Sequence, residues 1–252
     1  MALITLLTDF GTADPYVAEL RGVLYSRAPG VTLVDLSHGV SPGDVAGAAY
    51  LFGRAWHRFP AGTVHMVVVD PGVGTGRAAI GFGSGGHWFV GPDNGVFSSA
   101  LDQLDGPVIA IPAAVDAAPT FHGRDLFAPA AAAIALGRRL QELGEPLPTL
   151  PVRLAPAAPF YEGKVVVGEV ISVDRFGNLI TNLTPAEVPD YAVLEAEDAD
   201  IGSLRRTFGD VGSGELVAYL GSGGQIEVAV RDGSAARRLG VGVGGRVRAR
   251  LG

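Results

Sequence analysis

The chain has 252 residues, of which 48% are hydrophobic and 18% charged, a balance that excludes an intrinsically disordered protein. Its 26 acidic residues outnumber its 19 basic ones, and the resulting net charge of −7 argues against non-specific binding to nucleic acid or to an anionic membrane. Because the sequence contains no cysteine, disulfides, thiolate metal sites and a cysteine nucleophile are excluded.

The sequence pattern predicts neither secretion nor insertion into a membrane. The first ten residues have no cationic segment before their apolar run, which a signal peptide would have. The alanine-rich stretch 127–136 is about half as long as a membrane-spanning helix. We therefore expect a cytoplasmic protein with no nucleic-acid or membrane partner.

Short apolar runs alternate with helical patterns through the first half of the chain. Asp14-Pro15 is interpreted as the N-cap and first position of one helix, and Asp125 as the N-cap of another. The predicted strands are 3–8, 31–36, 63–69, 79–82, 88–90 and 108–111. The helix that Asp125 begins is predicted to extend over 125–142, and a third helix is predicted at 44–58. This alternation predicts an α/β domain with a mostly parallel sheet covered by helices on both faces.

The composition changes near residue 145. Residues 145–160 contain five prolines, which cannot continue a helix and suit an extended linker. Short β-type runs follow at 164–173, 179–182, 216–220, 225–230 and 246–251. We expect an N-terminal α/β domain at 1–145, a proline-rich linker at 146–160 and a smaller C-terminal β domain at 161–252, a β-barrel or a sandwich.

Several polar side chains follow predicted strands of the first half. Ligands of open α/β sheets bind at the carboxyl ends of the strands, because loops and helix N-termini converge there. One edge of the sheet is therefore predicted to gather Asp9, Asp70, Arg77, Asp93, Asn94 and His122.

Most of these residues also have a purely structural interpretation, His122 excepted because its loop leads to the same edge. Asp70 and Arg77 could form only an ion pair, and Asp93-Asn94-Gly95 is a common turn sequence. The other histidines, at 38, 57, 65 and 87, are interpreted as structural.

A metal site and a phosphate loop are also conceivable at this edge. Clustered aspartates with one histidine could bind magnesium or manganese, but Arg77 would repel the cation and no HxH, HxxxH or DxD spacing occurs in this half. The stretch DPGVGTGR at 70–77 lacks the GxxxxGK[ST] order of a phosphate-binding loop.

The second half has its own polar cluster. SVDRFGNLITN at 172–182 places Asp174, Phe176 and Asn178 within five residues, although turn and core roles explain such a segment equally well. The glycine-rich loop 221–224 permits either close approach to a ligand or a hairpin.

Six motifs in order resemble the S-adenosyl-L-methionine (SAM) hydrolases. This family is also called the SAM hydroxide adenosyltransferases, was formerly a domain of unknown function, and is related to the fluorinase and chlorinase. The motifs are LLTDFG at 6–11, VVDPGVG at 68–74, GPDNGV at 91–96, FHGRDLFAP at 121–129, DRFGNLITN at 174–182 and GSGGQIEVAV at 221–230.

The resemblance implies an N-terminal α/β domain, a C-terminal β-barrel and a homotrimer with SAM at the subunit interface. It implies hydrolysis of SAM to adenosine and L-methionine by in-line attack of water on C5′, with no cofactor and no metal. The family's catalytic residues would be Asp70, Arg77 and His122, with either Asp70 or His122 accepting the proton. The implied substrate-binding residues are Asp9 for the ribose, Phe121 and Phe176 for the ribose or adenine, Asn178 for the adenine edge, Asp174 for the methionine ammonium and Ser222 for its carboxylate.

One departure and three alternatives accompany this resemblance. Gly43 stands where similar proteins place a large aromatic residue against the nucleoside. The alternatives are a non-catalytic protein that binds SAM or adenosine, a metal-dependent phosphohydrolase, and a SAM-dependent halogenase. The halogenase is disfavoured because a carboxylate at position 70 would repel fluoride or chloride.

Overall fold

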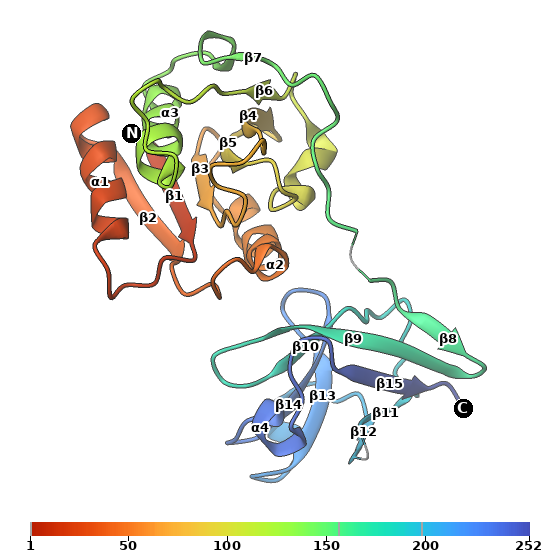
Figure 1. The fold of residues 1–252 in the computed structure, drawn as a ribbon. Coiled ribbons are helices and arrows are strands. Elements are labelled where there is room, and N and C mark those ends of the chain that lie inside the picture. The colour runs from red at the N-terminus through yellow and green to blue at the C-terminus, as the bar shows by residue number, and fades with distance from the viewer. Residues whose placement is uncertain (1, 156, 198) are drawn as a thin grey trace. The chain divides into compact units, whose positions relative to one another are not determined.

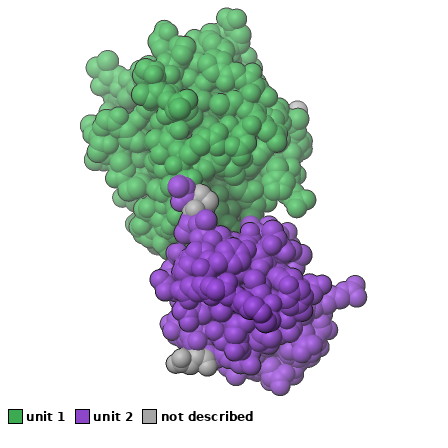
Figure 2. Space-filling model, turned by 90° about the vertical axis from the view of Figure 1, so that its right-hand side faces the viewer, with its two compact units in different colours: residues 1–154 green, residues 155–252 purple. Residues whose placement is uncertain are grey.

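The computed structural model describes residues 2–155, 157–197 and 199–252, which form two compact units, Met1–Leu154 and Ala155–Gly252 (Figure 2). The division falls within the stretch 146–160 expected to link two domains, while the expected domain boundaries stay a prediction. Within the described ranges, no helix has both the length and the apolar character needed to cross a bilayer.

A seven-stranded sheet forms the centre of the N-terminal unit. Its strands are β1 (Leu3–Thr8), β2 (Thr32–Ser37), β3 (Val64–Val68), β4 (Ala79–Ser84), β5 (His87–Pro92), β6 (Ile109–Ala110) and β7 (Glu145–Pro146), in the order β2-β1-β3-β5-β4-β6-β7. The pairs among β2, β1, β3 and β5 are parallel, and those among β5, β4, β6 and β7 are antiparallel. The α/β class is confirmed, but the sheet is mixed rather than mostly parallel, because the predicted hairpin β4–β5 reverses the chain.

Helices cover both faces of this sheet (Figure 1). The helices α1 (Tyr16–Arg27) and α3 (Ala128–Ala135) pack on one face, where Leu20, Leu24 and Ala131 are buried against Ile4 and Met66. The helix α2 (Val45–Ala55) covers the other face together with the 3₁₀ turn η2 (Ser98–Gln103). The 3₁₀ turn η1 (Trp56–Arg58) continues α2.

The single helix predicted at 125–142 is wrong. A π-helical turn, η3 (Gly123–Phe127), precedes α3, and the chain leaves α3 at Gly137, whose φ of +89° is the left-handed conformation typical of a helix end. A separate 3₁₀ turn, η4 (Leu140–Glu142), follows. The glycine and not the apolar periodicity decides where this helix stops.

The two aspartates predicted as N-caps do not cap helices. Pro15 occupies the cap position of α1, and no side chain hydrogen-bonds to the first turn there. The Asp125 carboxylate instead accepts from the backbone N–H of Ala118 and from the Arg124 guanidinium. Asp125 therefore ties a loop and a neighbouring cation to the start of α3.

The C-terminal unit is a nearly closed antiparallel barrel, as predicted. Its elements are β8 (Phe160–Glu162), β9 (Val165–Val173), β10 (Leu179–Thr181), β11 (Val193–Ala196), β12 (Ala199–Ser203), the 3₁₀ turn η5 (Phe208–Asp210), β13 (Leu216–Leu220), β14 (Ile226–Val230), α4 (Ala235–Leu239) and β15 (Arg246–Arg250). The strand order is β12-β11-β15-β9-β10-β14-β13, with β8 paired to β9. A bridge between Arg205 and Tyr219 links the segment after β12 to β13, which brings the two ends of the sheet together.

Two histidines form a buried hydrogen-bonded chain inside the N-terminal sheet. The Thr5 Oγ1 lies 2.7 Å from His65 Nδ1, and His65 Nε2 lies 3.1 Å from His87 Nδ1. Burial, together with the neighbouring His87, lowers the pKa of His65 to about 3 from an ordinary value of 6.5. Both rings therefore have a structural role as hydrogen-bonded partners inside the sheet, as predicted.

This histidine chain predicts a loss of stability in mild acid. Below pH 6.5 the unfolded chain binds a proton at residue 65 that the folded chain does not bind until about pH 3. The free energy of unfolding is thus expected to fall by about 2 kcal/mol between pH 8 and pH 5 from this group. Urea denaturation followed by tryptophan fluorescence measures this, because Trp56 and Trp88 both lie in the N-terminal unit. His65→Gln should remove most of the difference, and an equal pH dependence in that variant would contradict the assignment.

Candidate active site

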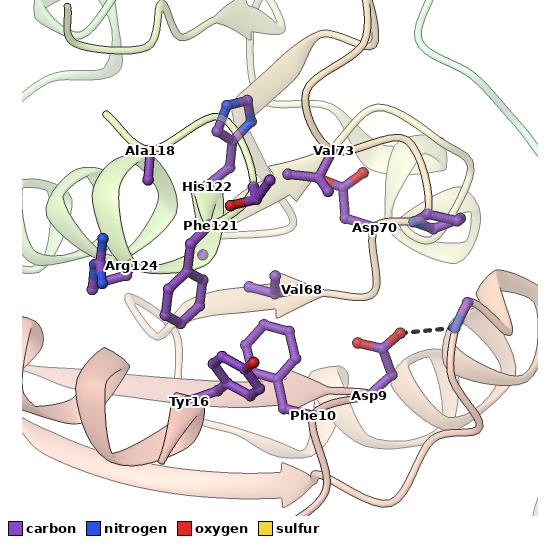
Figure 3. A pocket seen from close by; sticks show the side chains of 14 residues that line it. Asp9, Phe10, Tyr16, Val68, Asp70, Val73, Ala118, Phe121, His122 and Arg124 are labelled. Atoms are coloured by element: carbon purple, nitrogen blue, oxygen red, sulfur yellow. Dashed lines mark hydrogen bonds between the residues drawn. The ribbon is translucent and has the colours of Figure 1, made fainter. Parts of the chain in front are cut away.

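The main pocket of the N-terminal unit lies at the topological switch point of the sheet, where successive strands are added on opposite sides of β1. From β1 the chain first adds β2 on one side and then β3 on the other, so the loops leaving β1 and β3 diverge. A crevice outside the carboxyl ends of such strands is the usual ligand site of open α/β sheets. The pocket has a volume of about 530 Å³, within the range of small-molecule sites. Its lining includes Asp9, Phe10, Tyr16, Gly43, Asp70, Val73, Phe121, His122 and Arg124 (Figure 3).

Asp70 of this pocket forms a buried, bidentate ion pair with Arg77, which lines a neighbouring pocket together with His122. Asp70 follows the end of β3, and a series of turns at 71–76 returns the chain so that Arg77 faces it. The Arg77 Nε donates to Asp70 Oδ1 at 3.0 Å, and its Nη2 donates to Asp70 Oδ2. The side chains of Asp70 and Arg77 are only 5% and 8% exposed. Because little water reaches Asp70, the guanidinium of Arg77 supplies the compensation for its negative charge.

His122 adjoins this ion pair through a specific ring nitrogen. Its Nδ1 lies 3.3 Å from Arg77 Nη2. Arginine can only donate hydrogen bonds, so His122 Nδ1 accepts and the proton of the neutral ring lies on Nε2. While this contact is made, Nδ1 is not available as a base and Nε2–H is available as a donor.

The predicted ribose-binding carboxylate, Asp9, is anchored by a glycine of a neighbouring loop. The backbone N–H of Gly43 donates to Asp9 Oδ2 at 2.8 Å. Gly43 has a φ of +74°, a left-handed conformation that favours glycine, and a Cβ there would lie 3.7 Å from Pro71 Cβ, an ordinary contact distance. The glycine at this wall is therefore explained by backbone conformation and not by lack of space.

An aromatic cluster beside Asp9 joins the predicted Phe121 to two residues that the sequence analysis missed, Phe10 and Tyr16. The ring centroids of Phe10, Tyr16 and Phe121 are 5.4 to 5.8 Å apart in tilted and edge-to-face arrangements. Figure 3 shows the three rings grouped between Arg124 and Asp9. The Arg124 guanidinium lies over the Phe121 ring at 4.9 Å and pairs with Glu19 of α1. Phe121 was predicted from the family resemblance, and Phe10 could have been suspected because it directly follows Asp9.

Asp93 and Asn94, predicted at the same edge of the sheet as Asp70, do not line this pocket. The Asp93 Oδ1 accepts from the backbone N–H of Val152 at 2.8 Å, and burial raises the pKa of Asp93. The Asn94 Nδ2 donates to the carbonyl oxygen of Val69 at 2.8 Å. Asn94 therefore supports the end of β3 next to Asp70, which is a structural role.

Three of the predicted site residues in the C-terminal unit lie in one turn. The Asp174 carboxylate accepts from the backbone N–H groups of Phe176 and Asn178, each at 2.9 Å, and from Asn178 Nδ2 at 2.8 Å. The Phe176 side chain is 75% exposed, whereas Asn178 is buried. Phe176 and Asn178 line a second pocket, of about 720 Å³, together with Phe208. Ser222 lies on the loop between β13 and β14, and each unit thus carries its own set of predicted site residues.

Among the side chains that the structure describes, no three histidines, aspartates or glutamates cluster closely enough to hold a metal ion.

Comparison with known proteins assigns the family. Family models described as the SAM hydroxide adenosyltransferase N-terminal and C-terminal domains match residues 4–144 and 168–248. The chain belongs to this family. The (R)-S-adenosyl-L-methionine hydrolase of Thermus thermophilus is 44% identical, with 98% of this chain and 99% of that protein covered.

Two further comparisons place this family member more broadly. The fluorinase of an Actinoplanes species is 29% identical, with 90% of each chain covered. The crystal structure of an uncharacterized conserved protein from Thermotoga maritima matches with a TM-score of 0.89 and 33% identity, covering 98% of this chain and 99% of that one. The resemblance expected from the six sequence motifs is confirmed.

Proposed function

We propose that this chain hydrolyses SAM to adenosine and L-methionine. The observation that carries the proposal is the Asp70–Arg77 ion pair with His122 beside it, at a pocket of suitable size for a nucleoside. The hydrolase name of the Thermus thermophilus relative supports the same reaction.

The reaction needs little activation of its leaving group. The sulfonium of SAM departs as a neutral thioether, so the protein has to position a water molecule in line behind C5′. The oxygen of that water forms the new bond to C5′, the electron pair of the C5′–S bond goes to sulfur, and the water loses a proton. The products are adenosine, L-methionine and one proton, which balances the single positive charge of the sulfonium.

Asp70 is the group that holds the attacking water and accepts its proton. Its two oxygens are fixed by Arg77, which keeps the carboxylate oriented toward one position. His122 presents a donor at Nε2 and an accepting Nδ1 already engaged by Arg77, so it orients the water and does not act as the first base. His122 relays the proton only after its contact with Arg77 breaks.

The remaining predicted residues bind the rest of the substrate. Asp9 binds the ribose hydroxyls and Phe121 faces the ribose. Phe176 and Asn178 contact adenine, and Ser222 binds the methionine carboxylate. Asp174 binds the ammonium, since a carboxylate has about four acceptor positions and three are used within its own turn.

We further propose a homotrimer in which the C-terminal unit of a neighbouring copy completes each site, acting in the cytoplasm without a cofactor. The division of the predicted binding residues between two units supports this arrangement. The proposed domains are 1–145 and 161–252, with the linker at 146–160.

Removing the Asp9 carboxylate is expected to weaken substrate binding. Hydrogen bonds between a charged group and the ribose hydroxyls contribute about 1.5–3 kcal/mol, so Asp9→Ala should raise KM for SAM about 10- to 100-fold with kcat changed only a few-fold. Asp9→Asn, which can still accept from the Gly43 N–H, should show a smaller increase. Steady-state kinetics test this, and an unchanged KM in Asp9→Ala would exclude the ribose-binding role.

The decisive experiment for the function is incubation with SAM in EDTA-treated buffer, followed by chromatography for adenosine and methionine. Native protein should form both products without added metal, and Asp70→Ala should form neither. Binding of SAM without turnover by the native protein would instead indicate a ligand-binding protein. Turnover that EDTA abolishes would indicate metal-dependent chemistry, and a halogenated nucleoside formed in the presence of halide would indicate a halogenase.

A further inference from the structure

A buried carboxylate outside the proposed catalytic set lies in the C-terminal barrel. Glu227 is on β14, directly opposite Tyr219 of β13, and only 8% of the residue is exposed. The Tyr219 hydroxyl donates to Glu227 Oε2 at 2.9 Å. Burial, followed by this hydrogen bond, raises the pKa of Tyr219 well above its usual range, so the hydroxyl remains a donor. Burying a carboxylate costs several kcal/mol in desolvation, a cost that an apolar residue at this position would not have. Stability alone therefore does not explain a glutamate here.

Glu227 lies against the backbone of the loop that carries Ser222. A Cβ added to Gly221 would collide with the Glu227 carboxylate, so only glycine allows this approach. The loop is closed by hydrogen bonds from Gly221 N–H to the Gln225 carbonyl, at 2.8 Å, and from Gly224 N–H to the Gly221 carbonyl, at 3.0 Å. The carboxylate thus packs directly against the backbone immediately before Ser222.

The same pair is close to the other proposed amino-acid contact. Asp174 anchors the turn that carries Phe176 and Asn178, and its charge is the smallest of the causes that raise the pKa of Tyr219. The Phe208 ring packs on Tyr219 edge to face, with centroids 4.8 Å apart, and Phe208 lines the pocket that contains Phe176 and Asn178. Tyr219 and Glu227 therefore connect the Ser222 loop, the Asp174 turn and the barrel pocket.

We propose that Glu227, held by Tyr219, is a positioning residue for recognition of the amino-acid end of the substrate. It sets the Ser222 loop through Gly221 and adds a second negative charge near Asp174, both of which favour an α-ammonium group over a neutral end. This inference rests on the proposed function, and it assigns Glu227 to substrate selection and not to the hydrolytic step.

The test compares two substrates that share the adenosine and the sulfonium. The first is SAM, and the second is 5′-deoxy-5′-(dimethylsulfonio)adenosine, which has no amino-acid portion. Glu227→Gln and Tyr219→Phe are expected to raise KM for SAM about tenfold, to leave kcat within about twofold and to leave kcat/KM for the truncated substrate unchanged. Equal losses for both substrates, or an unchanged KM for SAM, would overturn the proposal.

Two further variants distinguish positioning of the Ser222 loop from a general loss of barrel stability. Gly221→Ala keeps both the carboxylate and the hydroxyl but displaces Glu227, so it should show the same selective rise in KM and serves if Glu227→Gln does not fold. Glu162→Gln, on β8, removes an exposed barrel carboxylate that pairs with Arg248 and should leave both substrates unaffected.

Calorimetry separates failure of this inference from failure of the proposed function. If the native protein hydrolyses neither substrate, the proposed function fails, but Glu227→Gln should still raise Kd for SAM about tenfold and leave Kd for adenosine unchanged. If Kd for SAM does not change, or if the native protein does not bind SAM, the role of Glu227 is refuted as well.

Discussion

Replacing Asp70 by asparagine is expected to lower kcat for SAM hydrolysis by about 100- to 10,000-fold, the usual contribution of a positioned base. Asparagine keeps the shape of the side chain and its acceptor oxygen but cannot take the proton from the attacking water. Binding of SAM, measured by calorimetry, should change only a few-fold, since the proposed partner of Asp70 is the attacking water and not the nucleoside.

Asp102→Asn is the matched control for this variant. Asp102 is an exposed carboxylate of the same unit that pairs with Arg153, and its loss should leave kcat within about twofold. A kcat for Asp70→Asn within tenfold of the native value would show that the carboxylate is structural and that the base lies elsewhere.

Replacing Arg77 by methionine is expected to destabilise the N-terminal unit by about 3–5 kcal/mol, because it leaves Asp70 buried without its counter-charge. The guanidinium also lies over the Phe127 ring at 5.4 Å, a contact that methionine only partly replaces. Urea denaturation at pH 8, followed by tryptophan fluorescence, measures the change in the unit that contains both tryptophans.

The double variant Asp70→Asn/Arg77→Met distinguishes charge from packing. Because it removes both charges, it should be more stable than Arg77→Met alone, whereas a pure packing defect would make the two equally unstable. A loss below about 1 kcal/mol in Arg77→Met would indicate that water reaches Asp70 and that the pair is not desolvated.

Much of the N-terminal sheet follows from the sequence because its strands are short apolar runs bounded by turn residues. The run 3–8 is β1 as predicted, and the glycines at 85 and 86 turn the hairpin β4–β5. Strand direction was less predictable, since it depends on which strands pair across the sheet. The strands β11 and β12 were missed because Val193–Ala196 and Ala199–Ser203 mix polar and apolar residues that only barrel pairing makes into strands.

In the candidate site too, residues placed by local sequence were predictable, and residues placed by contacts between distant parts of the chain were not. Asp70 and Arg77 were predictable because a charged residue ends an apolar strand and a glycine-rich turn returns an arginine to it. Tyr16 was not, because its relevance depends on Phe121, more than a hundred residues away in the chain. Asp93 was predicted at the same edge of the sheet as Asp70, but its carboxylate accepts from the backbone N–H of Val152, far away in the chain, and does not line the pocket.

The π-helical turn η3 makes the site sensitive to chain length. The N–H of Ala128 donates to the carbonyl of Gly123, five residues earlier, so this turn holds one residue more than an α-helical turn. Removing that residue would let an ordinary α-helix run into α3, but it would rotate the preceding Phe121 and His122 by about 100° around the helix axis. A shorter and more regular segment would thus be compatible with the fold and incompatible with the contact between His122 and Arg77. The extra residue of the π-helical turn therefore sets the position at which His122 meets Arg77.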